Sequence, residues 1–111
     1  MTDLRELEKR LEEATGGSED LNIEILHVLH DHGGFAREMV VVPNFTGSLD
    51  AAVALVERIL PAWIWDVTST GQAWVMHHET SEQHCADAKT PPVALCLALI
   101  RALIAKGDRH D

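Results

Sequence analysis

The sequence has few cysteines, few basic residues and no long apolar run, and each shortage excludes a class of protein. Its two cysteines, Cys85 and Cys96, are too few for a disulfide scaffold. Because 9 lysines and arginines stand against 18 aspartates and glutamates, the net charge is −9, and the surface should repel nucleic acid. The longest apolar run, residues 93–100, is far below the roughly 20 residues that span a bilayer. We therefore expect no membrane association and no direct nucleic-acid binding.

The remaining composition suits one folded domain. The chain has 111 residues, 46% of them hydrophobic, which is enough for a single core without disulfide staples. The charged first residues lack the apolar core of a secretory signal. These features predict one domain over residues 1–111, with reduced cysteines, in the cytoplasm.

Four segments have the periodicity and end signals of helices. Leu4, Leu7 and Leu11 share a face in the first, and Gly16 follows its end. The last helix is apolar nearly all round, which is typical of a helix buried on most sides. The predicted helices span residues 3–15, 18–31, 48–60 and 90–106.

The tryptophan-rich stretch between the last two helices predicts a β-hairpin over residues 63–79, with Gly71 in its loop. A third strand is predicted at residues 38–42 and a loop at residues 80–89. Both faces of the hairpin carry apolar side chains, so we expect cover on both sides. The predicted fold class is α+β: an α-β-α sandwich with a small antiparallel sheet.

Three segments carry a family resemblance: Glu12-Glu13-Ala14-Thr15-Gly16, residues 45–56 beginning Phe45-Thr46-Gly47-Ser48, and residues 90–99 beginning Thr90-Pro91-Pro92. In this order and spacing, the chain from residue 4 to residue 105 resembles the phage ABA sandwich domain family, small proteins of phage and prophage genomes. The resemblance implies helices on both sides of a sheet and an origin in phage or integrated phage DNA. It implies no activity and no functional residue. Residues 37–42 depart from the family pattern.

Histidine and cysteine side chains that gather near the end of the hairpin are the candidates for a metal site. Zinc takes four nitrogen or sulfur ligands, which these side chains supply. None of the familiar paired spacings is present, so scattered surface histidines are the alternative interpretation. The candidates are His77, His78, His84 and Cys85.

Two further groups are candidates for binding. Free N–H groups at Thr46, Gly47 and Ser48 could hold a small anion before the third helix, although capping by Ser48 itself is the ordinary alternative. The tryptophans could form a core, an aromatic patch or a dimer surface; they are Trp63, Trp65 and Trp74.

No nucleophile elbow, Walker loop or dinucleotide fingerprint is present, so we assign no catalytic residue and expect no cofactor. The first hypothesis is a non-enzymatic phage or prophage accessory protein that binds a protein or small ligand. The second is a metal-binding protein or metal-dependent enzyme that uses the histidines and Cys85. The third is a minor virion or assembly component, and a homodimer is compatible with each.

Overall fold

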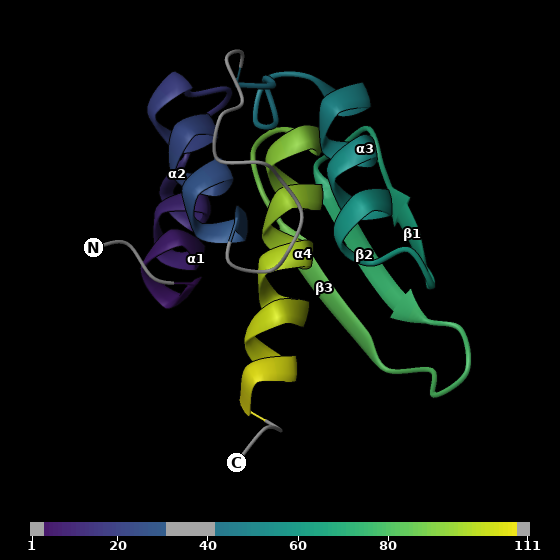
Figure 1. Cartoon of the computed structure of the whole chain (residues 1–111). Helices are drawn as coiled ribbons and strands as arrows, with labels where there is room; N and C mark the ends of the chain where they lie inside the picture. Colours follow the sequence, from purple (N-terminus) through teal and green to yellow (C-terminus); the bar gives the residue numbers. More distant parts are fainter. Residues whose placement is uncertain (1–3, 31–41, 109–111) are drawn as a thin grey trace.

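A computed structural model describes residues 4–30 and 42–108, which form four helices and a three-stranded sheet (Figure 1). The prediction of an α+β fold with a small antiparallel sheet is confirmed. Each predicted helix is present to within about two residues at either end. The helices are α1 (Leu4–Glu13), α2 (Glu19–His30), α3 (Leu49–Ile59) and α4 (Pro91–Asp108), and the strands are β1 (Trp63–Val67), β2 (Gln72–His77) and β3 (Gln83–Asp87).

The sheet is an antiparallel meander in the order β1-β2-β3. Trp65 lies opposite Val75 in the first pair, and Val75 lies opposite His84 in the second. The hairpin was predicted, but β3 lies within residues 80–89, where the prediction of a loop was wrong. Its sequence, Gln-His-Cys-Ala-Asp, is polar and has no β-branched residue, so tertiary pairing overrides its propensity. The predicted strand 38–42 lies outside the described residues except for Val42, which is in no strand.

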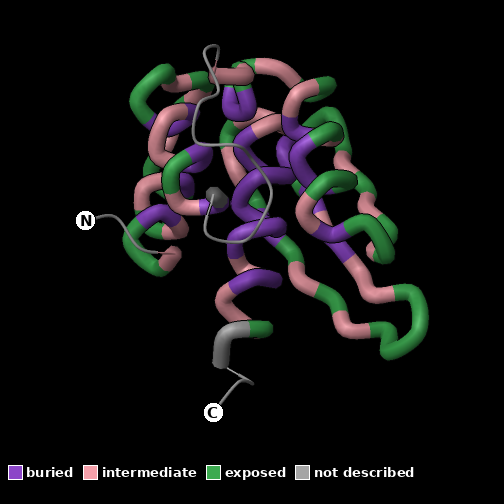
Figure 2. The backbone as a smooth tube through the Cα atoms, in the orientation of Figure 1, coloured by how far each residue is buried: buried purple, intermediate pink, exposed green. Residues whose placement is uncertain are grey.

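Helix α4 is the centre of the fold. Every residue from Val93 to Ile100 is at most 1% exposed, on all sides of the helix. The helix contacts all three strands, α1 and α3, while α2 packs against α1. Figure 2 shows this helix as the buried axis of the molecule. Within the described residues, none of the helices has the length and apolar character needed to cross a membrane.

The described helices lie on one side of the sheet. Figure 1 shows α3 and α4 in front of the strands, with α1 and α2 beside α4. The covered face, here called the inner face, holds the buried residues Ala73, Val75 and Ala86. The sequence predicted helical cover on both faces. The second face has no cover from residues 4–30 or 42–108, because α1 and α3 pack on the central helix α4, and α2 packs on α1.

Arg101 of α4 links its own helix to α1 and to β3 at the edge of the sheet. Its guanidinium donates to Glu8 Oε2 at 3.0 Å and to Glu12 Oε2 at 2.5 Å, both on α1, and to the Cys85 carbonyl on β3 at 2.9 Å. Burial alone would lower the pKa of Arg101, but the hydrogen bonds to Glu12 and Glu8 outweigh it and raise that pKa. The contact also occupies an outward-facing carbonyl of the edge strand β3.

Candidate functional site

The uncovered face of the sheet, here called the outer face, has an apolar centre and a polar rim. Ile64 is 47% exposed and lies directly opposite Met76, and Trp74 lies directly opposite Cys85. Because opposite residues in register share a face, these four side chains form one patch across all three strands. Exposed polar side chains surround it: Asp66, Gln72, Gln83 and Asp87.

The three tryptophans do not form a single patch. Trp63 and Trp65 lie on the inner face and are partly buried against the core. Trp74 lies opposite Asp66 and therefore on the outer face. The structure thus divides the predicted group: two tryptophans extend the core, and the third belongs to the uncovered surface.

Three of the candidate histidines gather where β2 turns into β3. The Trp63 ring contacts His77 edge-on with the centroids 5.4 Å apart, and it stacks on His84 at 6.1 Å. The His77 and His78 rings stack at 5.3 Å. His84 Nε2 lies 2.7 Å from Glu82 Oε2, an ion pair when the histidine is protonated. This histidine cluster lies at the β2–β3 turn, at the end of the sheet opposite the Gly71 turn.

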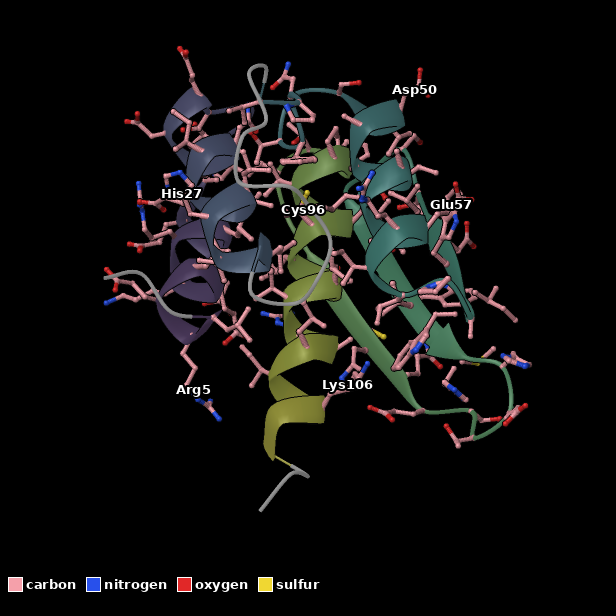
Figure 3. The ribbon with its side chains drawn as sticks, in the orientation of Figure 1. Arg5, His27, Asp50, Glu57, Cys96 and Lys106 are labelled. Atoms are coloured by element: carbon pink, nitrogen blue, oxygen red, sulfur yellow. The ribbon has the colours of Figure 1, made fainter. Side chains whose placement is uncertain are left out.

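The fourth candidate ligand, Cys85, does not join this cluster. Cys85 lies opposite Trp74 on the outer face, whereas His84 lies opposite Val75 on the inner face. His27 is exposed on the outside of α2 (Figure 3). In the part of the chain that the structure describes, no three His, Cys, Asp or Glu side chains are placed to hold a metal ion.

The N–H groups proposed for an anion are used within the protein. The Thr46 N–H donates to Asn22 Oδ1 at 2.9 Å, and the N–H groups of Gly47 and Ser48 donate to the Asn44 carbonyl at 3.2 and 2.9 Å. Ser48 caps α3 by accepting from Ala51 N–H at 3.3 Å. The loop therefore serves as a structural joint between α2 and α3, with protein acceptors in place of an anion.

A shallow hollow of about 370 Å³ lies where α1 ends and α2 begins. Arg10, at its wall, is paired with Glu24 of α2, and the Ser18 N–H donates to Thr46 Oγ1 at 2.8 Å. These polar groups already have partners inside the protein, so they are not available to bind a ligand in the hollow.

The two cysteines differ in reactivity, which gives a first prediction. Cys85 is exposed, whereas Cys96 is 1% exposed inside α4 and donates to the Phe45 carbonyl at 3.4 Å (Figure 3). Burial raises the pKa of the Cys96 thiol from 9.0 to about 12. A thiol reagent at about pH 8, below the ordinary range of a thiol pKa, should modify one thiol per native chain and two after unfolding.

The Cys85→Ser variant is the control, because it should leave no rapidly reacting thiol in the native state. Two rapidly reacting thiols in native wild-type protein would contradict the enclosure of α4.

The buried, neutral Cys96 thiol also makes the free energy of unfolding depend on pH in the alkaline range. Because its folded pKa is raised, its contribution is complete below about pH 9 and is lost as the pH rises toward 12.

Sequence reasoning named Trp74 for an aromatic patch but missed Ile64 and Met76 beside it, because both faces of the sheet were expected to be covered. The signal was present in the alternation: Ile64 and Asp66 stand between Trp63, Trp65 and Val67. An apolar residue beside an aspartate on the same face is typical of a partly solvent-exposed surface.

No protein-family model, no curated protein and no solved structure matches the chain.

Proposed function

We propose that this chain is a non-enzymatic accessory protein that binds a protein partner on the outer face of its sheet. The observation that supports this is the exposure of Ile64, 47%, beside Met76 and Trp74 on a face without described cover. Clustered apolar side chains inside a polar rim are typical of interaction sites. Tryptophan is enriched among the residues that contribute most to such interfaces.

The charge of the surface indicates the chemistry of the partner. Asp66 and Asp87 border the patch, and the whole chain carries −9. A second copy would bring two acidic rims together, which Coulomb repulsion disfavours. The occupant that fits is a protein segment with apolar side chains flanked by lysine or arginine.

The edges of the sheet support binding on the face rather than by added strands. At β1, the Val67 N–H donates to Asp66 Oδ1 at 2.8 Å, and the Trp63 N–H donates to the Leu60 carbonyl at 3.1 Å. At β3, Arg101 occupies the Cys85 carbonyl. Edge groups that are satisfied within the chain do not template another strand.

The resemblance to the phage ABA sandwich domain family remains the basis for the proposed setting. From it we infer that the chain is encoded in a phage or prophage genome and acts in the cytoplasm of a bacterial host. The partner would then be a host or phage protein present in the same compartment.

A matched pair of variants tests this proposal. Ile64 and Leu49 are the two large apolar side chains that are exposed within residues 4–30 and 42–108, at 47% and 39%. Ile64→Ser should weaken partner binding on the order of tenfold, because a buried apolar contact at an interface contributes roughly 1–2 kcal/mol. Leu49→Ser, the same change on α3, should leave binding unaltered.

The measurement is affinity capture from a host lysate with each variant, identification by mass spectrometry, and titration of the purified partner by calorimetry. The expected partner binds wild type and Leu49→Ser alike and releases at high salt. Equal binding by both serine variants would contradict the proposed surface. A concentration-dependent dimer that Ile64→Ser abolishes would replace the basic partner with a second copy.

A further inference from the structure

The turn between β2 and β3 is closed by two backbone hydrogen bonds, Ser81 N–H to the His77 carbonyl at 2.9 Å and His77 N–H to the Glu82 carbonyl at 2.8 Å, and by bonds that a histidine ring accepts. His77 Nδ1 lies 3.3 Å from the backbone nitrogen of Glu79 and 3.3 Å from that of Thr80. In the same turn, Ser81 has a φ of +61°, a left-handed conformation that is unfavourable for a residue other than glycine. The turn therefore depends on its other contacts, and the His77 ring supplies two of them.

The polarity of these bonds fixes the protonation state of His77. Backbone N–H groups can only donate, so His77 Nδ1 must accept, and the neutral ring must carry its proton on Nε2. Protonation would place a hydrogen on Nδ1, facing two other donors. Both contacts would then be lost.

The neighbouring histidines bond with the opposite polarity. His78 Nδ1 lies 2.7 Å from the Ala62 carbonyl, and His84 Nε2 lies 2.7 Å from Glu82 Oε2. Carbonyl and carboxylate oxygens accept, so both histidines donate. Because an imidazolium donates from both nitrogens, these two contacts survive protonation. Of the three rings, only His77 uses a bond that a proton removes.

The charged groups around His77 add to this response. The His78 ring is stacked on it at 5.3 Å, so two imidazolium rings there would repel each other. Glu82 is paired with His84, and Glu79 Oε1 lies 3.5 Å from His78 Nε2. Each carboxylate is therefore paired with a histidine other than His77. On α4, the helix packed over the sheet, the described charged side chains are Arg101 and Lys106, and Arg101 is bound to α1. From β1, the facing side chain is the uncharged Trp63.

We propose that the β2–β3 turn is a proton-sensitive device, held at Glu79 and Thr80 by neutral His77 and loosened there when His77 gains a proton. The inference rests on the hydrogen bonds of the turn and is independent of the proposed partner. The turn projects away from the C-terminal end of α4 at the lower right of Figure 1, so it can open without disturbing the central helix. Histidine is the side chain that ordinarily changes charge between about pH 5 and 8, so acidification is the stimulus to apply.

Nuclear magnetic resonance of the whole chain tests the inference. At about pH 8, where histidine is ordinarily neutral, ring nitrogen shifts should show His77 with its proton on Nε2 and His78 with its proton on Nδ1. As the pH falls through the titration of His77, the amides of Glu79 and Thr80 should lose protection from hydrogen exchange. After correction for intrinsic rates, the expected loss is on the order of 5–10-fold.

Two variants separate His77 from its neighbours. In His77→Gln, protection of the Glu79 and Thr80 amides should no longer depend on pH, whereas His78→Gln should keep the wild-type response. A neutral His77 with its proton on Nδ1 would overturn the proposal even if neither variant folds. Unchanged protection while His77 titrates, or a full response in His77→Gln, would also overturn it.

Discussion

Replacing Gly71 with alanine should destabilise this protein more than the same replacement at any other glycine that the structure describes. Gly71 has a φ of +93°, and a Cβ built there lies 2.1 Å from the Ala88 carbonyl oxygen. The left-handed conformation costs a non-glycine residue roughly 1–2 kcal/mol, and forced overpacking roughly 1–3 kcal/mol. We expect the free energy of unfolding to fall by about 2–5 kcal/mol and Tm by about 10–20 °C.

The position explains the size of the effect, because Gly71 joins all three strands. Its N–H donates to the Thr68 carbonyl in the β1–β2 turn at 3.2 Å, and its own carbonyl accepts from the Ala88 N–H, just after β3, at 2.8 Å. A shift that relieves the clash must therefore break a bond to one strand or the other. The residue cannot move without loosening the sheet on which α4 packs.

Gly16→Ala is the matched control. A Cβ at Gly16 meets nothing within 4 Å, and its backbone is outside the left-handed region. Thermal unfolding followed by circular dichroism should place the Gly16→Ala midpoint close to wild type. If Gly71→Ala unfolds at the same temperature as Gly16→Ala, the described junction of the strands is incorrect.

Local signals were sufficient to predict the helices. Ser48 and Pro61 bracket a segment with one apolar face, and α3 is found at Leu49–Ile59 against a predicted 48–60. Gly16 and Gly17 likewise separate α1 from α2. Helix caps and helix-breaking residues act within a few residues, so they can be recognised in the sequence without knowledge of the tertiary structure.

The layer order and β3 could not be predicted, because both depend on contacts between distant segments. The alternation of β1 showed that Trp63 and Trp65 share a face. It did not show that α4 would collect α1 and α3 around itself and leave Ile64 exposed. In β3, only His84 and Ala86 face the helices, which is too short an apolar pattern to stand out.

The partners of the candidate anion-binding and metal-binding groups could not be predicted for a related reason. Whether Thr46, Gly47 and Ser48 offer free N–H groups depends on Asn22 and Asn44, and Asn22 comes from another helix. Whether a histidine donates or accepts depends on the backbone atom that it meets. Sequence spacing locates such residues, but only the fold determines their partners.

The second large effect concerns α4, whose enclosure on all sides is the central claim. Leu97 and Leu99 are each 0% exposed, yet they point in directions about 160° apart around the helix. An ordinary amphipathic helix would bury only one of such a pair. Truncation to alanine leaves a cavity at either site, so Leu97→Ala and Leu99→Ala should each lower the free energy of unfolding by about 2–5 kcal/mol.

Equilibrium urea denaturation of these two variants, beside Leu49→Ala as the control for an exposed leucine (39% exposed), tests that claim most directly. The account predicts a similar, large loss of stability for Leu97→Ala and Leu99→Ala, and a loss of less than about 1 kcal/mol for Leu49→Ala. A large loss at only one of the two α4 positions would show a helix with a free side, and would contradict the central position of α4.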